Sequence, residues 1–203
     1  MSRRRRSRTA VRTGSGALAV LAALTLAGCS GEPDVAPPAP DTTRDDTAHA
    51  VASLPQRPAE LRVDELDPCT LFDRTTLNEL GITQRPERQG NTCVLAQRQL
   101  EPVYELHVAS MPRDGVSNWI TGDRSRPDTV SATPITIAGF PAVRVFPTAQ
   151  PEGHCDVVVG VAQGQALRVR FGTSYVSEVP HDRACALSEK AATAAVGALR
   201  GKG

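Results

Sequence analysis

Alternating apolar and polar residues predict a sheet in the second half of the chain. The period of two is clearest in QALRVRFGT, where Leu167, Val169 and Phe171 are apolar. Arg168 and Arg170 stand between them. Successive side chains of a strand point to opposite faces, so this pattern predicts one buried and one solvent-exposed face. The segments predicted to form strands are TCVLAQ (92–97), VYELHVAS (103–110), ITIAGFPAVRVF (135–146), CDVVVGVAQ (155–163) and QALRVRFGT (165–173).

Short connections between these segments predict antiparallel pairing. The first two are separated by residues 98–102, which contain Gln-Leu-Glu-Pro, and should form a hairpin, and the last two meet at a tight turn at Gly164. The third segment is interrupted by Gly139 and Pro141, two residues that break strands.

Three further segments predict helices. Asp67 suits an N-cap, Pro68 a first helical position, and Gly81 the stop of the same helix. A short helix is expected at residues 117–120, followed by the polar loop TGDRSRPDT. The alanine-rich segment 182–199 predicts a C-terminal helix, whose small side chains would let it lie close against the sheet.

The order α-β-β-α-β-β-β-α predicts an α+β fold, with an antiparallel sheet of about five strands packed by two or three helices. Residues 63–203 have the length of a single domain, about 140 residues. Residues 29–62 are rich in Pro, Ala, Asp and Thr and contain no aromatic residue. They are expected to form a disordered tether, because such a composition buries too little apolar surface to offset the entropy of ordering.

Residues 1–28 are expected to be a secretory signal peptide. MSRRRRSRTAVRTGSG carries six arginines and no acidic residue, and the apolar run ALAVLAALTLAG follows it. A basic segment before a short apolar segment is the pattern of an export signal. The run is short against the roughly 20 residues of a membrane-spanning helix, so we expect no transmembrane helix in the mature chain.

Leu26, Ala27, Gly28 and Cys29 resemble the lipobox of bacterial lipoproteins. In that motif the cysteine becomes the N-terminus and carries a diacylglycerol, and two acyl chains anchor a protein stably. We therefore expect Cys29 to be lipidated and the domain to be tethered to the outer side of the plasma membrane. The alternative is that Cys29 is a cysteine of a discarded signal peptide.

Charge argues against nucleic acid as a partner. Removal of residues 1–28 would leave 17 basic and 22 acidic residues, a net charge of −5. A chain of that charge lacks the basic surface that binding a phosphate backbone requires.

The remaining cysteines are an even set in an exported chain. Cys69, Cys93, Cys155 and Cys185 predict two disulfides, and four cysteines allow three connectivities. We favour Cys69 with Cys93 and Cys155 with Cys185, because each pair then closes a local unit. The alternative, a zinc site of four thiolates, requires close CxxC pairs, which the sequence lacks.

The motifs assembled so far resemble those of the domain-of-unknown-function family 3558, small lipoproteins of mycobacteria and their relatives. They are the lipobox, the Pro/Ala-rich tether, Asp67-Pro68-Cys69, Cys93 after Gly90-Asn91-Thr92, Gly139-Phe140-Pro141-Ala142, Cys155, and a last cysteine in the C-terminal helix. The likeness spans residues 61–199. A Cys-Thr-Trp sequence is typical at the second cysteine, whereas Val94 and Leu95 follow it here. The resemblance implies a location and a fold type, and no established activity.

No motif of the sequence predicts catalysis, a metal or a cofactor. His154, Cys155 and Asp156 are adjacent, but neighbours on a strand point to opposite faces and would not act together. Four scattered histidines lack the spacing of a metal site, and phosphate-binding glycine loops and the GxSxG elbow are missing. We therefore expect no enzymatic activity.

Charged residues on the predicted wet face of the sheet form the candidate binding face. Its members are Arg144, Arg168, Arg170 and His107, accompanied by Glu105. One hypothesis is that this face, or a cleft between it and the loop of Trp119, binds an anionic ligand or an envelope partner. The alternative is a solvated face without a ligand. Under the binding hypothesis, Arg168→Glu should abolish binding with little change in melting temperature.

These observations predict a lipid-anchored envelope protein that binds a partner or small ligand without catalysis. A second class is a carrier of an apolar or lipid-like molecule, which requires a large cavity between helices and sheet. An enzyme of unrecognised type is the third.

Overall fold

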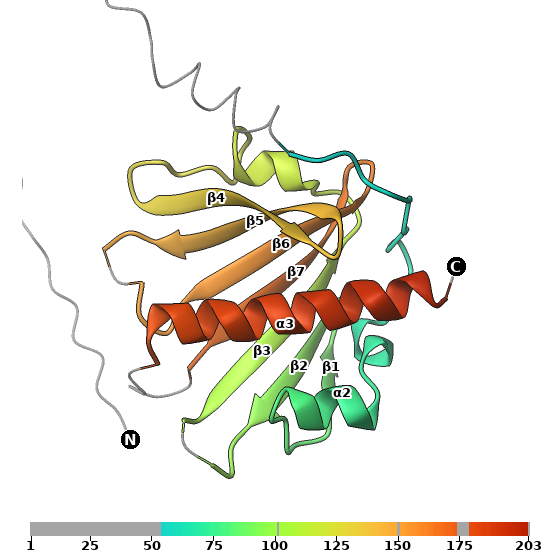
Figure 1. The fold of residues 1–203 in the computed structure, drawn as a ribbon, viewed down its shortest axis with the longest axis vertical. Helices are drawn as coiled ribbons and strands as arrows, with labels where there is room; N and C mark the ends of the chain where they lie inside the picture. Colours follow the sequence, from blue (N-terminus) through green and yellow to red (C-terminus); the bar gives the residue numbers. More distant parts are fainter. Residues whose placement is uncertain (1–53, 101, 150, 174–178, 203) are drawn as a thin grey trace, which may run out of the picture. The chain divides into compact units, whose positions relative to one another are not determined.

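The computed structural model describes residues 54–100, 102–149, 151–173 and 179–202. The predicted signal peptide, Cys29 and most of the predicted tether lie outside these residues. The seven strands are β1 (Glu87–Gln89), β2 (Thr92–Gln97), β3 (Tyr104–Met111), β4 (Val130–Ile137), β5 (Phe140–Pro147), β6 (Cys155–Ala162) and β7 (Gln165–Gly172). They form one antiparallel sheet in the order β1-β2-β3-β7-β6-β5-β4 (Figure 1). The predicted α+β class is confirmed, with seven strands in place of about five.

The two additional strands have different origins. The segment predicted as one interrupted strand is the hairpin β4–β5, because Ala138 and Gly139 both adopt positive φ, at 50° and 83°, and reverse the chain. Turns of this kind match the twist of the flanking strands. The other strand, β1, has three exposed polar residues and pairs with β2, so no apolar pattern marks it.

Prolines limit pairing at one side of the sheet. β4 pairs with β5 and lies at the end of the strand order. In an antiparallel pair, every second residue of a strand directs its backbone nitrogen away from the partner strand. The register from the turn at Ala138 and Gly139 places Pro134 among these residues of β4. Pro134 therefore lacks an N–H at the outer edge, a common protection against pairing with another chain.

One helix, α3 (His181–Arg200), lies across one face of the sheet (Figure 1). Ala184, Ala191, Ala192 and Ala195 are fully buried in this contact, which confirms that small side chains permit a close approach. The sheet contributes buried Val, Leu and Phe side chains to the same cluster, including Phe171. This layer is the main core of the domain.

Two short elements replace the single helix predicted near residue 70. They are the 3-10 helix η1 (Pro68–Leu71) and the helix α2 (Arg74–Glu79). The side chain of Asp67 accepts a hydrogen bond from the Cys69 amide at 3.0 Å, and Asp73 accepts one from Thr76 at 2.7 Å. Asp67 caps η1 and Asp73 caps α2, so the chain starts a new helix at Asp73 and does not continue η1.

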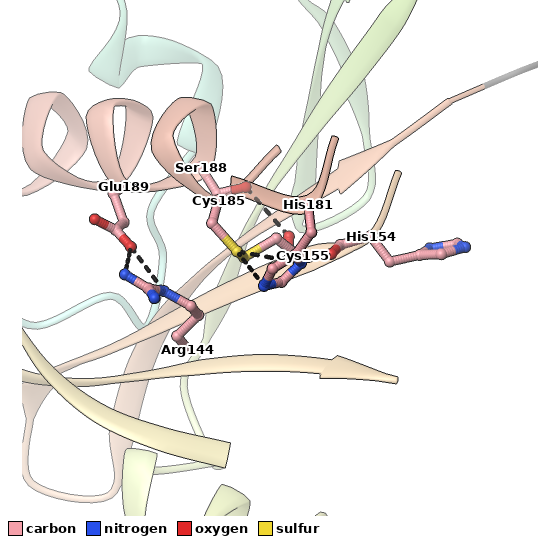
Figure 2. Close-up of a disulfide and its surroundings, with 7 residues drawn as sticks. All are labelled: Arg144, His154, Cys155, His181, Cys185, Ser188 and Glu189. Carbon is pink, nitrogen blue, oxygen red and sulfur yellow. Dashed lines mark hydrogen bonds and ion pairs between the residues drawn. A yellow bond between two sulfur atoms is a disulfide. The ribbon is translucent and has the colours of Figure 1, made fainter. Parts of the chain in front are cut away.

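Both favoured disulfides are present. Cys69–Cys93 joins η1 to β2, with the two Cα atoms 5.0 Å apart. Cys155–Cys185 joins β6 to the N-terminal part of α3, with a Cα separation of 5.1 Å, and Figure 2 shows it between helix and sheet.

The segment before η1 is packed on the domain from residue 54, inside the range predicted as a tether. The Leu61 amide donates to the Val161 carbonyl at 2.8 Å, and the Val63 amide donates to Gln165 Oε1 at 2.9 Å. Leu54 packs against the cluster of apolar residues around Trp119.

That cluster lies on the face of the sheet opposite α3, where the 3-10 helix η2 (Val116–Trp119) packs on Val143 and Val158. Its close approach depends on Gly160. A Cβ at Gly160 would lie 2.8 Å from Val116 Cγ1 and 3.4 Å from Pro141 Cγ.

We expect Gly160→Ala to lower the free energy of unfolding by about 1–3 kcal/mol, the usual cost of overpacking. The β-branched Val116 has few alternative rotamers, so η2 must shift away from the sheet. Trp119, the chain's single tryptophan, would then emit at longer wavelength. Urea unfolding followed by tryptophan fluorescence measures both effects. Unchanged stability and emission would show that η2 is not held at Gly160.

Candidate functional site

A cleft of about 1270 Å³ lies on the sheet face opposite α3, between the strands and the loop that contains η2. Five arginines line it, and we call it the arginine cleft: Arg113, Arg124, Arg126, Arg168 and Arg170, around Trp119. Apolar side chains of the lining include Met111, Val130 and Val145. The predicted cleft between the wet face and the Trp119 loop is therefore present.

Arg168 and Arg170 belong to the cleft because β7 directs both side chains away from α3. Leu167, Val169 and Phe171, which alternate with the two arginines, are buried under the helix, as the sequence pattern predicts. In the sheet, Arg170 is paired with His107 on β3 and with Asp156 on β6.

Asp156 is the counter-ion of both arginines. Arg168 donates to Asp156 Oδ2 from Nε at 3.0 Å and also from its terminal nitrogen. Arg170 Nε donates to Asp156 Oδ1 at 3.1 Å. The side chains of Asp156 and Arg168 are 13% and 18% exposed, so this ion pair is largely buried.

This burial changes the expected result for Arg168→Glu. The substitution would place a second carboxylate against Asp156, and removing one partner of a buried pair is strongly destabilising. The melting temperature should fall, so the variant cannot separate binding from folding. The exposed Arg113 and Arg126 are the better positions for that test.

Burial raises the pKa of Asp156 to about 6, while the charge and hydrogen bond of Arg170 and the charges of His154 and His107 lower it. The folded chain therefore takes up this proton more readily than the unfolded chain, where the ordinary value is 3.8. Stability from this group is present at low pH and is lost as the pH rises through 6.

When the pH is lowered from 7 to 5, the free energy of unfolding of the wild type should rise by about 1 kcal/mol relative to that of Asp156→Asn. The variant cannot take up the proton, so it serves as the reference at each pH. Urea unfolding of both proteins at the two pH values measures the difference. No gain, or a gain for the variant, would mean that the charges of Arg168 and Arg170 outweigh burial.

Trp119 forms the floor of the cleft between two guanidinium groups. Arg168 lies 4.9 Å and Arg124 5.7 Å from the ring centroid, within the range of cation–π attraction. The side chain is only 7% exposed, and its Nε1 has no hydrogen-bond partner among the described residues. Asp114 orients the loop, accepting from Arg124 Nε at 2.9 Å and from Asn118 Nδ2 at 2.8 Å.

The loop arginines were missing from the sequence-based candidate face. Arg113, Arg124 and Arg126 flank η2, and the available signal was their density around the single tryptophan. In the described residues, neither Arg113 nor Arg126 has a carboxylate within ion-pair distance, and Arg126 donates to the backbone carbonyls of Asp123 and Ser125.

The cleft is therefore positive in an acidic chain. Its lining contains five arginines against Asp114, Asp123 and Asp156, a formal excess of two positive charges. The chain without its first 28 residues has a net charge of −5, so positive charge is concentrated here.

The grouping of Arg144 with this face is wrong. Arg144 lies on the α3 side of β5, where its guanidinium donates to Glu189 of α3 from Nε at 2.9 Å (Figure 2). Its β5 neighbour on the same face, Ala142, belongs to the main core. Because β5 is apolar on both faces, alternation could not assign the arginine to one of them.

His107 lies on the predicted face but outside the cleft lining. Its Nε2 is 3.3 Å from Glu105 Oε2 on the same strand. It is a neighbour of Arg170 across the sheet.

The side chains of His154, Cys155 and Asp156 do not come together. Cys155 faces α3 in its disulfide, Asp156 faces the cleft, and Figure 2 shows His154 directed away from the sulfur atoms. The histidine that does approach the disulfide is His181, whose Nε2 is 3.6 Å from Cys185 Sγ.

Within the described ranges, no three His, Cys, Asp or Glu side chains are arranged to hold a metal ion. Among the same residues, no helix has the length and apolar character needed to cross a membrane.

A family model described as a protein of unknown function, DUF3558, matches residues 24–198. The match takes in the Leu26–Cys29 motif, both disulfides and the arginine cleft. No curated protein and no solved structure matches the chain.

Proposed function

We propose that this chain, which belongs to the DUF3558 family of proteins of unknown function, is an exported, lipid-anchored envelope protein that binds a partner through its arginine cleft. The observation that carries the proposal is the concentration of five arginines around Trp119 in an otherwise acidic chain. Arginine and tryptophan are the residues most enriched where interfaces gain their binding energy.

Export and anchoring are supported by the N-terminal sequence. The basic and apolar segments before Cys29 have the order of a signal peptide, and Leu26–Cys29 has the pattern of a lipobox. The two disulfides suit an oxidising compartment. The anchored chain would expose its domain on the outer side of the plasma membrane.

A binding role without catalysis is supported by the chemistry of the cleft. Two of its three carboxylates are engaged with arginines, Asp156 with Arg168 and Arg170, and Asp114 with Arg124. Cys155, beside the cleft, is bonded to Cys185 and therefore has no free thiol. These groups suit recognition of an anion better than proton transfer or nucleophilic attack.

The alternative of a carrier for an apolar molecule is less well supported. It requires room between α3 and the sheet, whereas buried alanine, valine, leucine and phenylalanine side chains occupy that layer. The arginine cleft lies on the other face and is lined by charged groups.

A photoreactive phenylalanine analogue at Asp123 tests the proposal in the living cell, since this exposed residue lines the cleft. The matched control carries the analogue at Ala186, an exposed position on α3. We expect a discrete adduct from position 123 that is absent from position 186 and is lost with Arg126→Glu. Equal adducts from both positions, or none from 123, would contradict a binding role for the cleft.

A further inference from the structure

We propose that the arginine cleft recognises an acidic polypeptide segment, through paired carboxylate–guanidinium contacts along its length. This inference rests on the proposed binding function and names the chemistry of its ligand. Four properties of the cleft support it: the spread of its charges, the partners that its arginines already have, its apolar walls and its exposed cations.

The five arginines come from two parts of the chain, and only Arg168 and Arg170 are seen to share one partner, Asp156. Arg168 and Arg170 are two residues apart on β7, whereas Arg113, Arg124 and Arg126 belong to the loop that faces the strand. A site for one phosphate or sulfate would gather its donors around a single anion. Separated guanidinium groups match charges that are repeated along an extended chain.

Carboxylates are the partners that the cleft already accepts. Asp156 lies between Arg168 and Arg170, and Asp114 receives Arg124. Aspartate side chains therefore fit the geometry of these guanidinium groups, and an incoming carboxylate would extend the same pattern. Asp156 would compete with an incoming carboxylate for Arg168 and Arg170.

The apolar walls favour a polypeptide over a simple polyanion. Met111, Val130 and Val145 line the cleft together with the charged groups. Side chains of a peptide can fill such apolar surface while acidic neighbours reach the arginines, whereas a phosphate chain has no apolar atoms to place there.

Arg113 and Arg126 are the cations available for a first encounter. Both are exposed, and in the described part of the chain neither forms an ion pair with a carboxylate. They can be replaced without disturbing the buried ion pair of Arg168 with Asp156.

Trp119 provides the readout, because it is the chain's single tryptophan and lies in the cleft. The mature chain is titrated with a decapeptide of glutamate, with decaglutamine and inorganic polyphosphate as comparisons. We expect a saturable fluorescence change with decaglutamate that weakens as salt rises, and no comparable change with the other two. Arg113→Ala with Arg126→Ala should weaken the binding about tenfold.

A matched double variant, Arg74→Ala with Arg183→Ala, removes two exposed arginines outside the cleft and should bind as wild type does. Asp156→Asn removes the competing carboxylate and should bind decaglutamate more tightly. Stronger binding of polyphosphate than of decaglutamate would overturn the inference, as would equal weakening by the two double variants. If the in-cell adduct at position 123 still forms, the binding function stands while its acidic-peptide chemistry falls.

Discussion

Replacing Phe171 with alanine is expected to lower the free energy of unfolding by about 3–5 kcal/mol, the largest effect of a single substitution considered for this domain. The side chain is 1% exposed and lies in the core beneath α3. Its ring stacks on Tyr104, with centroids 5.5 Å apart. Truncation leaves a cavity at the centre of the sheet, between β3 and β6, where the structure cannot easily collapse.

Urea unfolding of the oxidised protein measures this loss, and Phe171→Leu is the matched control. Leucine keeps most of the buried volume, so its cost should stay under about 1.5 kcal/mol. Near-equal effects of alanine and leucine would show that the core beneath α3 is loosely packed. A loss below about 1 kcal/mol for the alanine variant would contradict burial of the ring.

Removal of the Cys155–Cys185 disulfide should cost about 3–4 kcal/mol. The bond closes a loop with a sequence separation of 30 residues, and loop-closure entropy of that length corresponds to this value. The bond also fixes the N-terminal part of α3 on β6, while the alanine contacts hold the rest of the helix. Without it, α3 should detach more readily and expose the core.

The double variant Cys155→Ala with Cys185→Ala tests this expectation by urea unfolding and amide exchange. The comparison is Cys69→Ala with Cys93→Ala, which opens a loop of similar separation, 24 residues, away from α3. We expect similar losses of global stability but faster exchange in α3 for the first variant alone. Unchanged exchange in α3 would mean that the alanine interface holds the helix by itself.

Local sequence patterns predicted the elements that have one buried and one exposed face. The alternation around Arg168 and Arg170 gave the correct orientation of β7, because the two arginines occur on one face and Leu167, Val169 and Phe171 on the other. The same reasoning failed for Arg144, since β5 is covered by α3 on one face and by the η2 cluster on the other. A strand that is apolar on both faces has no alternation to read.

Backbone conformation accounts for the missed strand boundary. Ala138 adopts a positive φ, which non-glycine residues seldom do, and so the Ala-Gly sequence does not predict a hairpin turn. Gly139 and Pro141 marked an interruption without revealing a reversal of the chain.

The candidate site required tertiary structure. The sequence identified Arg168, Arg170 and the neighbourhood of Trp119, but the loop arginines join them only because η2 packs on Val143 and Val158. Gly160 makes that contact possible, and nothing in the local pattern marks this glycine as the point of approach. Charges brought together by packing are invisible to sequence periodicity.

The proposed envelope role requires export of the chain, and its intact mass tests this directly. The protein purified from its own membrane is measured before and after reduction. We predict a chain that begins at Cys29, carries a diacylglycerol, and gains the mass of four hydrogens when its two disulfides are reduced. A chain that retains residues 1–28, or lacks lipid and contains free thiols, would contradict the anchored, disulfide-braced protein described above.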